Sequence, residues 1–529
     1  MRKASTVLRN LLLSAAAALG ESLLRERATR SAPRDPVVWT PLPGQSVLLR
    51  GLEIIDVIRG QVLHQRGLLI REGRVQEILS AAKAASRQAD RVVDVPGLYA
   101  LPGLINAHCH ILLPMALDMR PDFLAAISRQ AERNFEECVA HGVTTIRDAG
   151  TFPMLLLRFK ERIERGELLG PRVLYAGSFI TAPGGYPSDY MKPLPPFLAR
   201  RWGDPVFLVE TPGAAADAVK RNHELGCCFI KTAMDDRALF VGQKTLPTLD
   251  DASLAAVLEQ AHAAGLKVSA HHRFRRGFRR AVEIGLDGLE HLPSDDYLTE
   301  EEVETFVSRG MYVVPTVTVG WALSGYSKGD PFLDDPMVRR FLAHRLEFVR
   351  AWYPAIAETG VYRAMLRFEK HYRDPSFVER RHLMYTLDPA IFTEALVKGR
   401  ENLMLLYRSG ALIGCGNDGG IPQSSPALVG LEIYLLQEAG MEPMDALRAA
   451  TINNARILGM EEELGSLDPG KLADVVLVAV NPLQDPLSLL TPVAVFKEGK
   501  LVYSAHRFEL GGDGGPSKGV SSPLEEKGG

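Results

Sequence analysis

The middle of the chain alternates short apolar segments with longer helical ones. Segments such as 251–264, rich in alanine and leucine, are predicted to be helices, and eight short apolar runs between them are predicted to be strands. Near-continuous apolar strands that alternate with helices are typical of a parallel sheet, and eight such units predict an α/β fold of the (β/α)8, TIM-like barrel type. The predicted strands cover residues 103–110, 143–150, 172–177, 227–234, 266–272, 285–292, 311–317 and 411–418.

Strand-rich segments flank this middle region on both sides. Residues 46–100 and 465–510 contain short apolar runs punctuated by glycine, for example VLLRGLEIIDV at 47–57 and VAVFKEGKLVY at 493–503. Such runs are typical of a small sheet or sandwich. We predict that the two segments pair into one small β-sandwich domain built from both chain ends, with the barrel at 101–460.

Residues 320–408 depart from the regular alternation. They form a long, aromatic-rich and predominantly helical insertion after the seventh predicted strand. Loops at that end of a barrel's strands cover the active site, so one interpretation is a lid or a substrate-selecting element. A contact between copies in a homo-oligomer is the other.

The two ends of the chain differ from the rest in composition. Residues 1–10 carry three basic side chains and residues 11–19 are apolar, which fits an export signal but is too short for a membrane span. Residues 21–30 continue a basic helical pattern, so a membrane-peripheral helix and a plain cytoplasmic extension are alternatives for 1–35. Residues 511–529 predict a disordered tail.

Composition narrows the class of partner. The 529 residues are 46% apolar and 24% charged, as in a soluble globular protein with a large core. The net charge of −3 and the lack of a basic stripe argue against nucleic acid, which leaves a small-molecule substrate. Five cysteines without regular spacing predict core packing rather than a disulfide framework.

Candidate chemistry begins in LPGLINAHCHI, residues 101–111. Side chains alternate across a strand, so His108 and His110 share one side and Cys109 faces the other. Two co-directed imidazoles at a strand end make half of a zinc site, although packed histidines are the alternative.

Further polar residues stand at the carboxyl ends of the other predicted strands, where barrel enzymes keep their chemistry. They are Lys231, His271, His291 and Asp418. The neighbouring His272 competes with His271, because only one of two adjacent side chains on a strand faces inward.

In combination, the motifs LPGLINAHCH, IKTA, VSAHH, GLEHL, GNDGG and GSLDPGKLADVVLV resemble those of the metal-dependent amidohydrolase superfamily. The resemblance covers roughly residues 46–504 and is greatest to its imidazolonepropionase-like and prolidase-like (Xaa-Pro dipeptidase) branch. It implies a (β/α)8 barrel with a small β-sandwich formed by both chain ends.

The resemblance also implies a binuclear centre of divalent metal ions, with zinc expected. The implied ligands are His108, His110 and Asp418 for the more buried ion, N6-carboxylated Lys231 as a bridge, and His271 and His291 for the more exposed ion. An apolar site supports the carbamate, because it leaves the lysine amine neutral and nucleophilic. A lysine paired with a carboxylate is the alternative.

The reaction implied by this centre is hydrolysis of an amide, in a dipeptide or an N-acyl amino acid, by a metal-bridging hydroxide. Asp418 would move the proton from the water to the leaving amine, and His291 would help to orient the substrate. An ester, lactone or phosphotriester is an alternative substrate for the same centre. A non-catalytic scaffold is disfavoured, because the whole ligand set is present.

The loop TAPGGYPSDY at 181–190 departs from the branch's pattern. Tyr186 stands where a Gly-Gly-His element would place histidine, which argues against an imidazolonepropionase-type substrate. Side chains that could bind a substrate, by hydrogen bonds or as a bidentate clamp on a carboxylate, are Tyr186, Tyr190, Arg147, His272 and Arg273.

Overall fold

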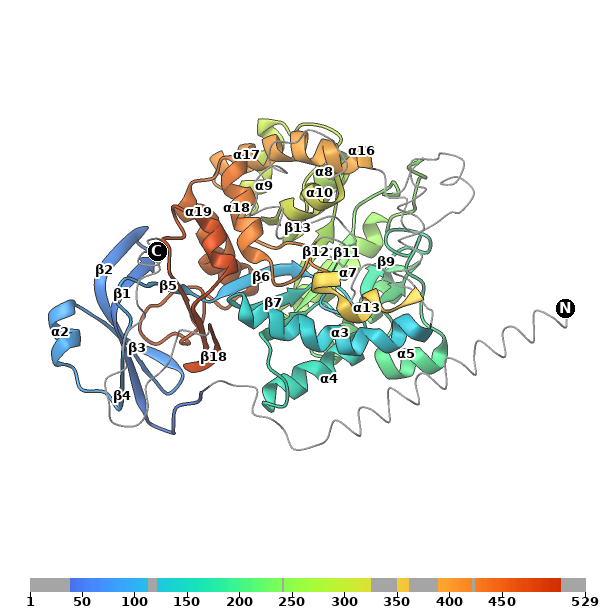
Figure 1. The fold of residues 1–529 in the computed structure, drawn as a ribbon. Coiled ribbons are helices and arrows are strands. Elements are labelled where there is room, and N and C mark those ends of the chain that lie inside the picture. The colour runs from blue at the N-terminus through green and yellow to red at the C-terminus, as the bar shows by residue number, and fades with distance from the viewer. Residues whose placement is uncertain are drawn as a thin grey trace.

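Eight parallel strands form the centre of the molecule, and each lies within one of the eight predicted segments (Figure 1). The computed structural model describes residues 39–112, 121–239, 242–324, 350–360, 389–420 and 424–505. The central strands are β6 (Leu104–Cys109), β7 (Val143–Asp148), β8 (Arg172–Tyr175), β11 (Phe229–Ala233), β12 (Lys267–His271), β13 (Gly288–Glu290), β14 (Tyr312–Val314) and β15 (Leu412–Ile413). Strands β6 and β7 are buried at every position, including the polar and charged residues of β7, such as Arg147 and Asp148.

The eight strands are hydrogen-bonded as two parallel sheets, β6-β7-β8 and β11-β12-β13-β14-β15. Individual backbone hydrogen bonds connect them at both edges. Ala107 N–H donates to the carbonyl of Cys415 on one side, and Cys228 N–H donates to the carbonyl of Tyr175 on the other. The structure is therefore mixed α/β, with two sheets in contact at both edges rather than one continuous ladder.

A short parallel pair, β9 (Phe179–Thr181) and β10 (Val206–Leu208), comes after β8 in the chain. Neither strand was predicted from the sequence. Strands of three residues are too short for alternation to reveal. Strand β9 begins the chain that carries Tyr186 and Tyr190 toward the centre of the molecule.

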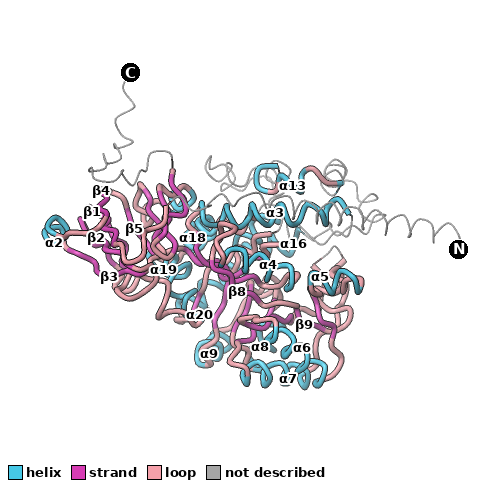
Figure 2. Tube along the Cα trace, turned by 90° about the horizontal axis from the view of Figure 1, so that it is seen from below, coloured by secondary structure: helices cyan, strands magenta, loops and turns pink. Residues whose placement is uncertain are grey.

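Both chain ends contribute to a second sheet of eight strands, in the order β18-β17-β16-β5-β1-β2-β3 with β4 beside β1. Figures 1 and 2 place β1–β5 at one end of the molecule, and Figure 1 shows β18 beside them. Strand β3, at one end of this order, also contacts the segment before β16, because Val75 N–H donates to Lys471 O. The strands are β1 (Ser46–Asp56), β2 (Gln61–Arg71), β3 (Arg74–Leu79), β4 (Arg91–Asp94), β5 (Tyr99–Pro102), β16 (Val475–Val478), β17 (Ala494–Lys497) and β18 (Lys500–Ser504). The domain boundaries given above stay a prediction.

Helices separate the central strands and cover them. The helix α9 begins with a capping box between Thr299 and Glu302, and α7 begins with the Asp250 carboxylate accepting from Ser253 N–H. The helices are α2 (Ala81–Ser86), α3 (Pro121–Ala140), α4 (Pro153–Glu164), α5 (Pro196–Trp202), α6 (Pro212–Glu224), α7 (Asp251–Ala263), α8 (Arg275–Ile284), α9 (Glu300–Ser308), α10 (Val317–Ser324), α13 (Pro354–Ala357), α16 (Pro389–Glu394), η2 (Ala395–Gly399), α17 (Arg400–Arg408), α18 (Val429–Ala439), α19 (Pro443–Arg448), η3 (Ala449–Asn453), α20 (Asn454–Leu458) and η4 (Pro486–Leu490).

The predicted insertion at 320–408 is helical where the structure describes it. Helix α10 spans its start, and α16, η2 and α17 follow one another at its end. The buried carboxylate of Glu432 on α18 accepts from the N–H groups of Val317 and Thr318, so it caps α10 from a distant part of the chain. The segments 325–349 and 361–388, and the predicted extension and tail at 1–35 and 511–529, lie outside the described residues. Within the described residues, none of the helices has the length and apolar character needed to span a membrane.

Gly416 tests how closely the chain after β15 must approach β6. A Cβ at this position would lie 2.5 Å from His108 N and 2.7 Å from His108 Cβ. We therefore expect Gly416→Ala to destabilise the protein by about 1–3 kcal/mol through overpacking. Urea denaturation checks this against Gly213→Ala, whose Cβ would meet no atom within 4 Å. Equal midpoints for the two variants would contradict the close approach.

Candidate metal centre

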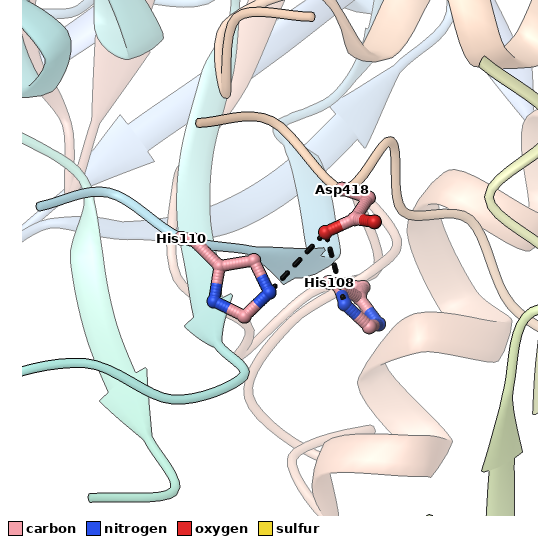
Figure 3. A group of neighbouring side chains, drawn as sticks. All are labelled: His108, His110 and Asp418. Atoms are coloured by element: carbon pink, nitrogen blue, oxygen red, sulfur yellow. Dashed lines mark ion pairs between the residues drawn. The ribbon is translucent and has the colours of Figure 1, made fainter. Parts of the chain in front are cut away.

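Two strand ends bring His108, His110 and Asp418 together (Figure 3). Strand β6 ends at Cys109, and the chain after β15 leads to Asp418. The Oδ1 atom of Asp418 lies 3.4 Å from Nε2 of His108 and 3.2 Å from Nε2 of His110. Burial disfavours ionisation of Asp418, but the two imidazoles outweigh it and hold the pKa of the carboxyl well below its usual range.

Hydrogen bonds at the far side of each ring orient these histidines. Nδ1 of His108 lies 2.7 Å from Oε2 of Glu290, and Nδ1 of His110 lies 2.8 Å from the carbonyl oxygen of Gly150. A donating Nδ1–H leaves the Nε2 lone pair available to a bound metal ion. Cys109, which lies between the two histidines in the sequence, is buried, and its Sγ lies 3.9 Å from the carbonyl oxygen of Arg147.

Lys231 on β11 is fully buried in the same interior. Its Nζ lies 3.7 Å from Oε1 of Glu290, beyond hydrogen-bond distance, and has no hydrogen-bond partner among the described residues. Burial lowers the pKa of Lys231 to about 8, although the charge of Glu290 opposes this. The lysine thus has a carboxylate neighbour, as the alternative interpretation requires, and also an orphaned amine, as carboxylation requires.

His271 and His291 complete the cluster of rings. The His291 ring lies 4.9 Å from the His108 ring and 4.5 Å from the His271 ring, between centroids. Nδ1 of His291 lies 2.6 Å from Oγ1 of Thr316, and Nε2 of His271 lies 3.0 Å from Oδ2 of Asp235. Burial lowers the pKa of both imidazoles, so both are neutral, as metal ligands must be.

Two buried carboxylates beside these histidines were missed by the sequence interpretation. Glu290 stands beside His291 in GLEHL, and Asp235 follows IKTA. Burial opposes the charge of Glu290, yet Arg147 and Lys231 hold its pKa well below the usual range, whereas burial raises the pKa of Asp235 to about 7. The signal available in the sequence was an acidic residue next to, or close after, a strand that carries a ligand.

Backbone strain marks the ends of three of these strands. Asp418, His291 and Thr316 have φ of 48°, 75° and 51°, in the left-handed region that side chains other than glycine rarely adopt. Such conformations cluster at functional sites, where the surrounding structure holds them in place. At His291 the strain also breaks strand alternation, so that Glu290 and His291 both reach the interior.

The five candidate substrate-binding residues fall into different places. Tyr186 stacks on His271 with 3.8 Å between ring centroids, and Tyr190 O–H donates to Tyr186 at 3.2 Å. Arg273 is buried, with a guanidinium nitrogen 3.9 Å from Oδ2 of Asp418. These three lie beside the metal-ligand cluster, which consists of the candidate ligands His108, His110, Lys231, His271, His291 and Asp418.

Arg147 and His272 are turned elsewhere. Arg147 donates to Glu290, to the Tyr312 hydroxyl and to the carbonyl of Ala107, so the partners the structure gives it belong to the protein interior. His272 packs its ring 5.8 Å from the Phe278 ring of α8. The register therefore places His271, and not His272, in the ring cluster.

The donor set fits divalent metal ions. One oxygen of Asp418 and one nitrogen each of His108 and His110 all lie within 4.8 Å of one another. Lys231 Nζ and His271 Nε2 are buried polar atoms with no hydrogen-bond partner among the described residues. Neutral imidazoles, a carboxylate and an orphaned amine around one space are a plausible donor set for zinc.

Comparison with known proteins identifies the family. The sequence profile of the amidohydrolase family matches residues 99–502, so the chain belongs to this family. Its solved structural neighbours include prolidase and Xaa-Pro dipeptidase enzymes, and its sequence relatives include an imidazolonepropionase. Family membership implies a TIM-like barrel with an additional domain and supports hydrolytic activity.

Individual relatives are distant or cover part of the chain. A crystal structure of a prolidase complexed with N-methylphosphonate-L-proline has a TM-score of 0.65 and 23% identity, covering 87% of this chain and 100% of the prolidase. The imidazolonepropionase of Symbiobacterium thermophilum is 46% identical over 72 residues, 13% of this chain and 17% of the relative. A 5-methylthioadenosine/S-adenosylhomocysteine deaminase of the same organism is 32% identical over 129 residues, 20% of this chain, and the match spans 30% of the deaminase.

Substitution of Glu290 and Asp235, the carboxylates beside His108 and His271, tests the candidate metal centre. We expect Glu290→Gln and Asp235→Asn each to weaken binding of one metal ion about 10- to 100-fold, because a candidate ligand histidine loses the carboxylate beside it. Competition with a chromophoric chelator measures the affinity. Glu432→Gln is the matched control, since Glu432 is also fully buried but accepts its hydrogen bonds from the start of α10. Wild-type affinity in both test variants would contradict the assignment.

Proposed function

We propose that this protein is a binuclear metal-dependent hydrolase that cleaves the amide of a dipeptide or an N-acyl amino acid. The observation that carries the proposal is the convergence of His108, His110 and Asp418, with Lys231 orphaned in the same interior. His271 and His291 would serve the second ion. The contacts at both edges of the two parallel sheets support a closed (β/α)8 barrel around this centre.

Bound divalent ions, zinc by our proposal, supply Lewis acidity and lower the pKa of water. The protein's own residues hold and move the proton. Asp418 takes a proton from the attacking water as the C–O bond forms at the scissile carbonyl, and returns it to the amine nitrogen as the C–N bond breaks. The products are a carboxylic acid and a free amine.

The side chains around the ligands exclude water and orient the substrate. Tyr186 and Phe392 are large rings beside His271 and Arg273, and Arg273 places a cation next to Asp418. A cation at this position favours a substrate that carries a negative charge close to the scissile bond. It favours a carboxylate-bearing amide over a neutral ester or lactone, the alternative substrates of the same centre.

A substrate screen tests the proposal directly. We expect the zinc-loaded enzyme to hydrolyse members of a panel of dipeptides and N-acyl amino acids faster than neutral esters and lactones. Lys231→Ala should lose one of two metal ions and most activity, because the bridging ligand and its charge vanish. Metal content is measured by mass spectrometry, with Lys267→Ala on the adjacent strand as control. Two ions and full turnover in Lys231→Ala would contradict the carbamate, and no hydrolysis of any panel member would contradict the function.

The pKa of Lys231 makes formation of the carbamate pH-dependent. Carbon dioxide reacts with the neutral amine, and with a pKa of about 8 the neutral fraction rises roughly tenfold per pH unit below that value. At constant dissolved carbon dioxide, we therefore expect reactivation of chelator-treated enzyme by zinc to speed up with pH and to level off above about pH 8. The rate of reactivation is measured by withdrawing samples at fixed times and assaying their activity. A rate that ignores both pH and carbon dioxide would contradict carboxylation.

A further inference from the structure

A cavity of about 530 Å³ opens beside the metal-ligand cluster, between α10, η2 and α18. Arg273 and Thr316 line it, and both contact Nδ1 of His291, at 3.2 Å and 2.6 Å. The walls are mainly apolar, from Leu292, Val317, Trp321, Leu396, Tyr434 and Leu435. The cavity has the size and lining of a site for a small organic ligand.

Arg273 is the charged group that the cavity shares with the centre. It is 4% exposed, its guanidinium lies over the Phe392 ring, and its Nε has no hydrogen-bond partner among the described residues. Among the described residues, Asp418 is the only acidic side chain within ion-pair distance, at 3.9 Å. A buried guanidinium needs a hydrogen-bonding anion to offset its desolvation.

The two polar neighbours of Arg273, Asp418 and His291, would both be ligands when metal ions are bound. If Nε2 of His291 is a ligand, Nδ1 carries the proton and donates to Thr316, so it no longer accepts from Arg273. Asp418 is then committed as a ligand as well. The guanidinium is left to pair with an anion supplied by the substrate.

We propose that Arg273 binds the α-carboxylate of the amino acid released by hydrolysis, and that the cavity holds the side chain of that amino acid. The substrate class is then N-acyl amino acids and dipeptides whose C-terminal residue is large and apolar. This inference rests on the function proposed above and assigns the substrate of the same site.

Covalent geometry supports this assignment. In an N-acyl amino acid, the scissile nitrogen, the carboxylate and the side chain are bonded to one Cα atom, so all three lie within a few ångströms of one another. Arg273 likewise touches the cluster through Asp418 and His291 and lines the cavity. One α-carbon seated here therefore directs its nitrogen to the ligands, its carboxylate to the guanidinium and its side chain between α10 and α18.

The first arm of the experiment tests the charge. Acetate release is measured from N-acetylphenylalanine and from its neutral carboxamide. We expect kcat/KM of the wild-type enzyme to favour the carboxylate about 10- to 100-fold, the value of a charge-assisted hydrogen bond, and Arg273→Gln to abolish the preference. Arg273→Lys should restore part of it, because it returns the charge without the planar fork. A preference that survives in folded Arg273→Gln overturns the proposal.

The second arm tests the cavity. Gly320 on α10 lines it, and a Cβ there would lie 3.6 Å or more from its neighbours, so Gly320→Leu fills the space without a clash at Cβ. We expect the ratio of kcat/KM for N-acetylphenylalanine over N-acetylglycine to fall about tenfold or more. Gly213→Leu, at an exposed position with nothing within 4 Å, is the control and should keep the wild-type ratio. An unchanged ratio in Gly320→Leu overturns the proposal.

Calorimetric titration with the products phenylalanine and glycine separates this inference from the function. Tighter binding of phenylalanine that is weakened by Arg273→Gln and by Gly320→Leu supports the site even if no amide is hydrolysed, in which case the proposed function fails alone. Hydrolysis of N-acetylglycine and N-acetylphenylalanine at equal rates, without effect of either variant, overturns the site and leaves the function standing. Neither hydrolysis nor product binding overturns both.

Discussion

The buried carboxylate of Glu290 is the interaction on which the interior of this protein depends. Its oxygens accept from His108 on β6, Arg147 on β7 and Ser269 on β12, and Lys231 on β11 lies nearby. A charge with no exposed surface is tolerated only when several donors surround it. These donors come from strands of both parallel sheets, so one residue joins the two sheets electrostatically and sets the tautomer of a candidate metal ligand.

The surroundings of the ligands are arranged asymmetrically. On one side Tyr186 stacks on His271, and Asp235 approaches the same ring from its Nε2 edge. On the other side Arg273 and Thr316 meet His291 and open onto an apolar cavity. Helix α10, which forms one wall of that cavity, is held by the Glu432 carboxylate of α18. The helices after β14 and β15 thus line the cavity, while the strands and the segments that follow them carry the candidate ligands.

Strand periodicity explains how much of the candidate site could be predicted. His108 and His110 share a side because side chains alternate, and the ends of parallel strands meet at one edge, which brings Asp418 to them. The same rule separates His271, whose ring lies beside that of His291, from His272, whose ring lies beside that of Phe278. It fails at GLEHL, because the positive φ of His291 interrupts the alternation and lets Glu290 face the interior as well. The position of Arg147 could not be predicted in this way, because its partners Glu290 and Tyr312 are 143 and 165 residues away in the sequence.

The sequence by itself determined the eight central strands and the amidohydrolase family, because apolar runs and short motifs are local properties of the chain. The tertiary structure was needed to show that these strands form two sheets in contact at both edges and that Glu290 and Asp235 lie beside His108 and His271. It was also needed to show that Arg273 lies near Asp418 and lines a cavity. These features depend on distances between residues that are far apart in the chain. They also depend on burial, which lowers the pKa of Lys231 and removes the Arg273 guanidinium from water. Neither quantity exists until the chain has folded.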